Sequence, residues 1–278
     1  MKTQVITPEL RRWIIEQASA GHSPESILTA MEGSGWDEEV ALAALDETIH
    51  AYAREVQAAQ KAMPEVQMPA GSSRVWVHDR EVAVVVSLKR PRVVVFADFL
   101  SSEECEAMIE LSKPKLARSE TVETTTGGSE VNVARTSRGM FFTRGEHELC
   151  ARIEARIEAL LNWPVDRGEG LQVLHYSPGA EYKPHYDYFD PEQSGTAAVL
   201  RRGGQRVGTL VMYLNTPKVG GATVFPDAGL EVSALAGHAV FFSYGQPNPS
   251  TLTLHGGAPV VEGEKWVATK WLREQRFD

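Results

Sequence analysis

Residues 171–191 read LQVLHYSPGAEYKPHYDYFDP, and this stretch contains the first candidate metal-binding residues. We expect strands over 170–176 and 183–188, because both runs have strand-like composition. His185 and Asp187 lie two positions apart, so on an extended segment both side chains point to the same face. A lone His-x-Asp pair is a weak signal, since strand histidines are commonly surface residues or hydrogen-bonded to the backbone.

A second histidine completes a possible ligand set. His255 follows the run STLTL on another expected strand. Two histidines and one carboxylate can occupy one face of an octahedral metal and leave the other positions open, as in non-haem Fe(II) oxygenases. The same three residues could instead hold zinc for hydrolysis, because three protein ligands plus water also suit that ion. The lack of a general-base glutamate motif disfavours this alternative.

Lys265 is the candidate cationic anchor of the site. Glu262-Gly263 offers a turn that would return Lys265 to the barrel interior, beside the metal. An unpaired buried ammonium is unfavourable, so it needs an anion such as the far end of a metal-chelating dicarboxylate. The alternative is a strand lysine whose charge reaches water. By the same test, Lys270 is expected to be solvated on the face away from the core.

The order of the expected elements predicts the fold class. After a few helices the chain consists mostly of short strands, which is typical of an α+β jelly roll with helices packed outside its sheets. A helix opens at Ser101 with a capping box to Glu104, and another covers 146–161. Residues 119–134 and 189–205 are expected to form loops over the site. The expected strands cover 82–86, 93–96, 170–176, 183–188, 206–214, 230–233, 238–243 and 264–273.

The chain divides into three parts by pattern and composition. The apolar spacing in residues 1–62 predicts a small bundle of three helices, with N-caps at Thr7, Ser23 and Asp37. The third helix region faintly resembles ubiquitin-associated domains, but we favour a plain helical dimerisation or docking bundle, because short patterns often match by chance. Residues 63–73 are rich in Pro, Gly and Ser and predict a linker, whereas residues 74–278 form the main domain.

Composition narrows the class of protein. The chain has 278 residues, a formal net charge of −9 and 42% hydrophobic residues, which is typical of a globular protein. The acidic balance argues against broad nucleic-acid binding, because that requires a basic surface. Neither a membrane-spanning stretch nor a signal-peptide core is present in the sequence. With only two cysteines, Cys105 and Cys150, we expect a cytoplasmic protein with reduced thiols.

Several segments in one order resemble the prolyl 4-hydroxylase family. The resemblance covers residues 92 to 273, and the segments that carry it are RTSRGMFF, LQVLHYSPGAEYKPHYDYFDP, GGQRVGTLVMYLNTP, GGATVFP and LHGGAPVVEGEKWVATKWLRE. The resemblance implies a double-stranded β-helix, which is a jelly-roll core. It also implies an oxygenase that uses Fe(II), O2, 2-oxoglutarate and often ascorbate. The chain departs from the family pattern at Ala258, where many relatives carry cysteine. It also has an N-terminal helical bundle, which argues against carrying over a collagen substrate.

The resemblance also implies a role for each matching residue. The implied iron ligands are His185, Asp187 and His255, and Lys265 would pair with the distal carboxylate of 2-oxoglutarate. The implied residues of the cosubstrate pocket are Tyr176, Tyr213 and Thr223. The implied residues of the substrate groove are Tyr182, Arg206 and Trp271. Tyr213 and Trp271 could equally be core residues, and Arg206 could be a surface ion-pair partner.

The resulting functional hypothesis is a 2-oxoglutarate-dependent dioxygenase. Its expected reaction is 4-hydroxylation of a prolyl residue in a peptide or protein, with release of succinate and CO2. One alternative keeps the chemistry and changes the substrate to a free amino acid or a small metabolite. Another is a binding protein, in which residues 1–62 recruit a protein partner and the barrel is a degenerate scaffold. The intact set of three ligands and the lysine argue against degeneracy.

Overall fold

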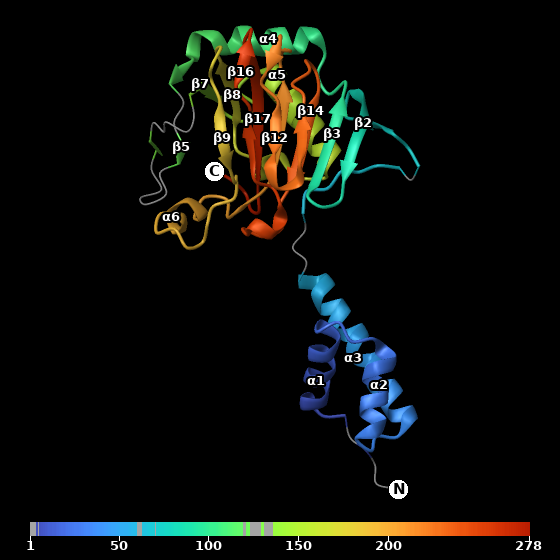
Figure 1. The fold of residues 1–278 in the computed structure, drawn as a ribbon. Coiled ribbons are helices and arrows are strands. Elements are labelled where there is room, and N and C mark those ends of the chain that lie inside the picture. Colours follow the sequence, from blue (N-terminus) through green and yellow to red (C-terminus); the bar gives the residue numbers. More distant parts are fainter. Residues whose placement is uncertain are drawn as a thin grey trace. The chain divides into compact units, whose positions relative to one another are not determined.

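The computed structural model describes residues 4, 6–59, 63–69, 71–118, 121–122, 129–130 and 136–278 (Figure 1). The chain forms two compact units, residues 1–62 and residues 63–278. Within the described residues, no helix combines the length and the apolar character needed to cross a membrane.

The first unit contains three helices around a core of its own. The side chains of Thr7 and Ser23 cap the first two helices, and Asp37 accepts a hydrogen bond from the Glu39 amide at the start of the third. All three caps were expected from the sequence. The helices are α1 (Pro8–Ser19), α2 (Pro24–Gly33) and α3 (Glu38–Ala59). The buried apolar residues between them are Ile14, Ile27, Met31, Ala41, Ala44 and Leu45.

The second unit is built on a large sheet. Nine strands of the described residues form it in the order β1-β2-β3-β14-β10-β17-β8-β7-β4, and neighbouring strands are antiparallel. In that order the strands are β1 (Arg74–Val77), β2 (Arg80–Leu88), β3 (Arg92–Ala97), β14 (Ala239–Ser243), β10 (Arg206–Tyr213), β17 (Lys265–Arg273), β8 (Leu171–Tyr176), β7 (Arg138–Phe142) and β4 (Ala117–Arg118).

A smaller sheet carries the candidate ligands. Its four strands follow the order β13-β12-β15-β9. They are β13 (Leu230–Val232), β12 (Thr223–Phe225), β15 (His255–Gly257) and β9 (Tyr182–His185). Two further pairs are β11 (Val219–Gly220) with β16 (Val260–Glu262), and β5 (Thr121–Val122) with β6 (Ser129–Glu130).

The helical elements of this unit are few. The α-helices are α4 (Ser102–Ser112), α5 (Glu148–Leu161) and the short α6 (Thr196–Leu200), and the 3-10 turns are η1 (Lys113–Lys115), η2 (Val165–Arg167), η3 (Pro226–Ala228) and η4 (Pro249–Thr251). The predicted capping box at Ser101 and Glu104 is present at the start of α4. Of the predicted loop 119–134, the described pieces are β5 and β6, which pair with each other. The rest of that prediction lies outside the described residues.

Two apolar layers hold the second unit together. One lies between the large sheet and helices α4 and α5, and includes Phe96, Met108, Ile153 and Leu210. The other lies between the two sheets and includes Tyr213, Phe225, Phe242 and Val267. Figure 1 shows the strands of both sheets in the body of this unit, with α4 and α5 beside them. The predicted jelly-roll core with flanking helices is therefore confirmed.

The large sheet is covered on both faces, which makes one expectation wrong. Strand β17 lies in the interior of this sheet, and all nine of its residues are buried. Lys270 is only 1% exposed and forms an ion pair with Glu154 of α5, which is equally buried. The expectation that Lys270 is solvated assumed that one face of β17 is exposed to water. Helix α5 covers that face instead, so the lysine needs a buried anion.

Residues 63–69, predicted as part of a linker, make contacts within the second unit. The amides of Glu65 and Gln67 donate to the carbonyls of Leu161 and Leu160 at the end of α5. Val66 is buried in the layer beneath α5, and Glu65 pairs with Arg92. A segment with two prolines can thus lie as an ordered strap on a domain surface.

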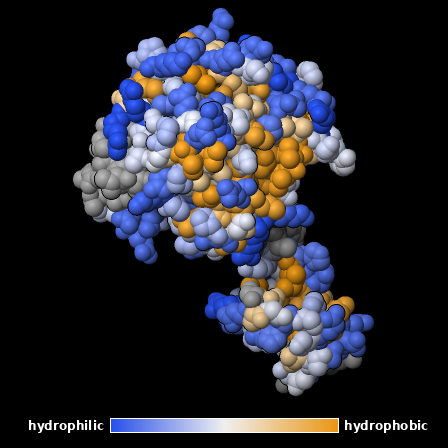
Figure 2. Space-filling view, turned by 45° about the horizontal axis from the view of Figure 1, so that its top comes forward, coloured by the Kyte–Doolittle hydropathy of each residue, from blue (hydrophilic) through white to orange (hydrophobic). Residues whose placement is uncertain are grey.

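Hydrophobic and hydrophilic side chains are unevenly distributed over the surface. In the space-filling view (Figure 2), the visible face of the second unit has a hydrophobic area surrounded mainly by hydrophilic residues. Large apolar side chains that are exposed in this unit include Trp76, Val85, Phe141, Val219 and Val261. The ring of Phe141 lies 6.5 Å from that of Trp271.

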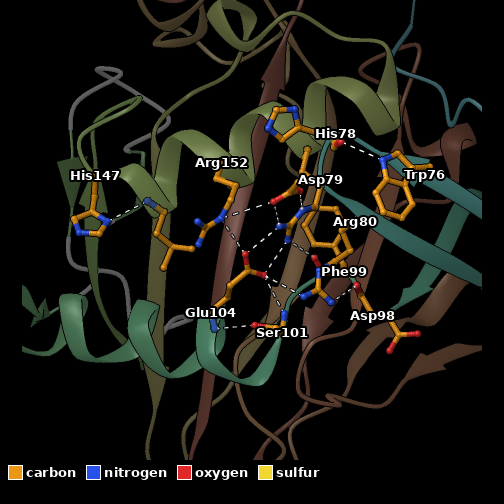
Figure 3. A network of polar contacts seen from close by, with 12 residues as sticks. Trp76, His78, Asp79, Arg80, Asp98, Phe99, Ser101, Glu104, His147 and Arg152 are labelled. Atoms are coloured by element: carbon orange, nitrogen blue, oxygen red, sulfur yellow. Dashed lines mark hydrogen bonds and ion pairs between the residues drawn. The ribbon is translucent and has the colours of Figure 1, made fainter.

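A buried cluster of charges joins three elements of the second unit (Figure 3). Arg156 of α5 is 1% exposed and donates two hydrogen bonds to Asp79, in the turn between β1 and β2. It also donates two to Glu104 of α4 and one to the carbonyl of Phe99. Burial would raise the pKa of Glu104, but Arg156 outweighs it and holds that pKa below its usual value. The cluster therefore ties both helices to the edge of the sheet.

Replacing Arg156 with methionine is expected to destabilise the fold strongly. Two acidic groups would lose their buried cation, which typically lowers the free energy of unfolding by about 3–5 kcal/mol. Because the pKa of Glu104 and of Asp79 is lowered in the folded state, the stabilisation is present at neutral pH and is lost as the pH falls below about 4. Urea unfolding of wild type and variant at pH 7 and pH 3.5 measures both effects.

Glu81→Gln is the matched control for this cluster. Glu81 pairs with Arg74 at 3.1 Å, but both side chains are about half exposed. Exposed pairs contribute under about 1 kcal/mol, so this variant should unfold like the wild type. An Arg156→Met variant as stable as Glu81→Gln would contradict the role given to the cluster.

Candidate functional site

Strand pairing brings the two candidate histidines together. Strands β9 and β15 are antiparallel neighbours, and His255 lies directly opposite His185. The ring centroids are 4.4 Å apart. Asp187 lies two residues past the last residue of β9, and one possible ligand atom from each of the three residues lies within 4.8 Å of the others. The sequence predicted this grouping, although it placed Asp187 inside the strand.

The histidine rings are oriented by their own backbone. Nδ1 of His185 lies 2.9 Å from the carbonyl of Lys183, and Nδ1 of His255 lies 3.0 Å from the carbonyl of Thr253. A carbonyl only accepts, so each Nδ1 carries the proton and each Nε2 keeps its lone pair. The two Nε2 atoms lie 3.5 and 3.4 Å from the two carboxylate oxygens of Asp187. Three electron-pair donors that face one another in this way suit a bound cation.

The charge states of these groups fit metal binding. Burial lowers the pKa of His255 to about 4, against the opposing effect of Asp187, so its ring is neutral at pH 7. Burial alone would raise the pKa of Asp187, but the two histidines and Arg206 outweigh it and hold that pKa well below its usual value. Neutral imidazoles and an ionised carboxylate are the forms that bind metal ions.

Lys265 lies in the same pocket without an anionic partner. It is 4% exposed and pairs in register with Tyr176 of β8. Its Nζ lies 5.6 Å from the ring centroid of Tyr176 and 5.8 Å from that of Tyr213. Among the described residues, no carboxylate lies within ion-pair distance of Nζ. Burial therefore lowers the pKa of Lys265 to about 8.

One pocket contains most of the predicted site residues. The ten residues named from the sequence include eight that line it: His185, Asp187, His255, Lys265, Tyr176, Thr223, Tyr182 and Trp271. Tyr213 lies behind the wall and donates a 2.8 Å hydrogen bond to Thr223 Oγ1. The remaining lining residues are mainly small or apolar, among them Leu174, Val211, Gly256, Gly257 and Val267. The pocket thus joins the candidate metal ligands to the lysine through a largely apolar space.

Arg206 lies beside the pocket and is used in an ion pair. Its Nε and Nη2 donate to the two oxygens of Glu169 at 2.7 and 2.9 Å. The guanidinium also stacks 4.1 Å from the ring centroid of Trp271 and 4.8 Å from that of Phe189. Glu169, the partner in this ion pair, was not predicted from the sequence as a site residue. The ion pair with Glu169 holds the Arg206 guanidinium against the ring of Trp271, which lines the pocket.

Two further buried polar residues were missed by sequence reasoning. Thr209 of β10 donates a 2.7 Å hydrogen bond to Oδ2 of Asp187. The hydroxyl of Tyr244 lies 2.9 Å from Thr209 Oγ1. Thr209 stands in an apolar strand that pairs with β14, which directly precedes Tyr244. A threonine inside such a strand was the available signal, since a buried hydroxyl requires a partner.

Comparisons with known proteins agree on one family. A model of the 2OG-Fe(II) oxygenase superfamily matches residues 171–273. Prolyl 4-hydroxylase 5 of Arabidopsis thaliana is 42% identical over 208 residues, which is 67% of this chain and 70% of that protein. Probable prolyl 4-hydroxylase 3 of the same plant is 41% identical and covers 66% and 69%. The crystal structure of a viral collagen prolyl hydroxylase from Paramecium Bursaria Chlorella virus-1, in a 2OG complex, superposes with a TM-score of 0.50 at 29% identity, over 65% of this chain and 95% of that one.

Removing the buried charge of Lys265 should stabilise the protein. A pKa lowered from 10.5 to about 8 corresponds to a cost of about 3 kcal/mol for the ammonium at pH 7, which Lys265→Met would relieve. The folded pKa is below the unfolded one, so the wild type gains stability as the pH rises from 8 to 10.5. The difference between the two proteins should therefore shrink over that range. Urea unfolding at pH 7 and pH 10 measures it.

Lys218→Met provides the comparison for this prediction. Lys218 is 74% exposed at its side chain and pairs with Glu262 on the surface. Its replacement should change the free energy of unfolding by less than about 1 kcal/mol at either pH. If Lys265→Met is no more stable than Lys218→Met at pH 7, the ammonium of Lys265 is solvated.

Proposed function

Since the chain belongs to the prolyl 4-hydroxylase family of Fe(II)- and 2-oxoglutarate-dependent dioxygenases, we propose that it hydroxylates prolyl residues of a peptide or protein. The products of such a reaction are the hydroxylated residue, succinate and CO2. The observation that carries the proposal is the convergence of two Nε2 atoms and one carboxylate in a pocket that also contains an unpaired lysine. A zinc hydrolase and a metabolite hydroxylase are not favoured by the family match.

We assign the metal to His185, Asp187 and His255. The donor set fits, because both imidazoles present their unprotonated Nε2 toward an ionised carboxylate. Three protein ligands on one side of a divalent ion leave positions for other ligands. When bound, Fe(II) with 2-oxoglutarate and O2 supplies the oxidising power for hydroxylation. The protein contributes the orientation of the ligands and the pocket that surrounds them.

Lys265 is assigned to the distal carboxylate of 2-oxoglutarate. Its ammonium is buried, and the described residues offer it no anion, so a dicarboxylate that enters the pocket would supply the missing charge. Tyr176 and Thr223 line the same space, and Tyr213 orients the Thr223 hydroxyl through its hydrogen bond. These three side chains are proposed to shape the cosubstrate site around the lysine.

The substrate groove is assigned to the aromatic side of the pocket. Tyr182 and Trp271 line it, and the Phe141 ring, which is 55% exposed, lies 6.5 Å from that of Trp271. Aromatic walls are a common way to bind proline-rich segments, because the rings pack on preformed polyproline helix. We place a prolyl peptide there, with Arg206 holding the Trp271 ring from behind.

Three further assignments complete the proposal. Ascorbate is proposed as the accessory reductant, as in the family. A reducing, cytoplasmic setting is proposed because Cys105 and Cys150 are both free thiols buried in the fold. We also propose that residues 1–62 form a domain of their own that binds a protein partner.

Loss of a metal ligand should abolish turnover while the fold remains. His185→Ala and Asp187→Ala are each expected to reduce succinate formation by at least 100-fold, because the remaining two ligands hold the metal poorly. Succinate release with 2-oxoglutarate and Fe(II) measures the effect, with circular dichroism as the check on folding. His175→Ala is the control, since His175 pairs with Glu264 outside the pocket. Full turnover in both ligand variants would refute the metal assignment.

The choice of substrate can be decided by mass spectrometry. We expect proline-rich peptides to gain one oxygen atom at proline and to raise succinate formation above the uncoupled level. Free L-proline should do neither, because it cannot span the aromatic side of the pocket. Trp271→Ala should reduce peptide hydroxylation by at least 10-fold and leave uncoupled succinate formation within about 2-fold. Hydroxylation of free proline in preference to peptides would overturn the substrate assignment.

A further inference from the structure

Three buried side chains form a chain of hydrogen bonds behind the pocket. Tyr244, Thr209 and Asp187 are 2%, 0% and 6% exposed. The Tyr244 hydroxyl is 2.9 Å from Thr209 Oγ1, which is 2.7 Å from Asp187 Oδ2. The Tyr244 amide also donates to the carbonyl of Val207, so the residue is anchored beside β10. This chain of hydrogen bonds runs from the end of β14 to the candidate metal ligand Asp187.

The direction of these hydrogen bonds follows from chemistry. An ionised carboxylate has no proton to donate, so Thr209 must donate its single hydroxyl proton to Asp187. The oxygen of Thr209 is then available only as an acceptor, and the Tyr244 hydroxyl must donate to it. Removing the phenol hydroxyl would therefore remove one of the two hydrogen bonds that fix the Thr209 hydroxyl beside Asp187. Hydrogen bonds in such a chain also polarise one another, which strengthens the contact to the carboxylate.

Asp187 needs this support more than the histidines do. His185 and His255 are held by strand register and by bonds from Nδ1 to their own backbone. Asp187 lies beyond the end of β9, so no strand pairing orients its carboxylate. Arg206 reaches only its backbone carbonyl, at 3.4 Å.

We propose that Tyr244 is a positioning residue that acts through Thr209 to fix the carboxylate of Asp187. The hydrogen bond from Thr209 to Oδ2 restricts rotation of this carboxylate, whose two oxygens face the Nε2 atoms of His185 and His255. This inference rests on the proposed function, because it assumes that Asp187 is a ligand of the metal.

The test is Co²⁺ binding to the full chain after removal of metal with a chelator. Isothermal titration calorimetry gives the dissociation constant, and the visible spectrum of bound Co²⁺ reports its coordination. Supporting partners of ligands typically contribute 10–100-fold to metal affinity, so Tyr244→Phe and Thr209→Val should each weaken Co²⁺ binding by about 10-fold. Thr209→Ser keeps the hydroxyl and should bind as the wild type does. The spectrum should change in Tyr244→Phe and Thr209→Val but not in Thr209→Ser.

The double variant tests whether Tyr244 acts through Thr209. If it does, Tyr244→Phe combined with Thr209→Val should bind Co²⁺ no more weakly than Thr209→Val alone. Tyr188→Phe is the control, because its ring packs 6.1 Å from that of Tyr244 and the same atom is removed outside the hydrogen-bonded chain. It should leave affinity and spectrum unchanged.

The outcomes separate this inference from the proposed function. Wild-type affinity in Tyr244→Phe, or additive losses in the double variant, would overturn the role of Tyr244. In either case the metal assignment would stand if His185→Ala still lost Co²⁺ binding. Should Tyr244→Phe fold poorly, equal affinities of Thr209→Val and Thr209→Ser would overturn the inference instead. Failure of the wild type to bind Co²⁺ at all would overturn both.

Discussion

The pairing of β9 with β15 is the constraint on which the site depends. It sets His185 opposite His255 across two short antiparallel strands. Because side chains alternate between the faces of a strand, a slip of one residue in this pairing would turn His255 away from His185. The register is in turn held by the packing of the small sheet on the large one, through residues such as Phe225 and Phe242. The packing that forms the core between the sheets therefore also sets the positions of the two candidate histidine ligands.

The apolar layer between the sheets also determines the electrostatics. It removes water from His255, Asp187 and Lys265, which keeps the imidazole neutral and leaves the ammonium without compensation. The fold tolerates this unfavourable charge because extensive burial elsewhere stabilises it. An unpaired buried charge of this kind is typical of binding sites that are complete only when a ligand is bound.

Much of the site could be predicted from spacing and residue type. His185, Asp187, His255 and Lys265 lie in one pocket as expected, and strand periodicity sets the side-chain direction of His185, His255 and Lys265. The contact between Thr209 and Tyr244 could not be found this way, since Thr209 lies in β10 and Tyr244 directly after β14, and these strands meet only in the folded sheet. Lys270 was assigned to the wrong environment because the sequence does not show that α5 covers the second face of β17. The contacts of residues 63–69 likewise depend on tertiary packing that composition does not reveal.

Strand β17 has a mechanical consequence for the enzyme. Lys265 and Lys270 are five residues apart on it, so one side chain enters the pocket while the other pairs with Glu154 of α5. A single strand thus connects the helical layer to the lysine that we propose as the cosubstrate anchor. The partner of Lys270 on α5 and the proposed cosubstrate site are therefore linked through one strand, although no residue of α5 lines the pocket.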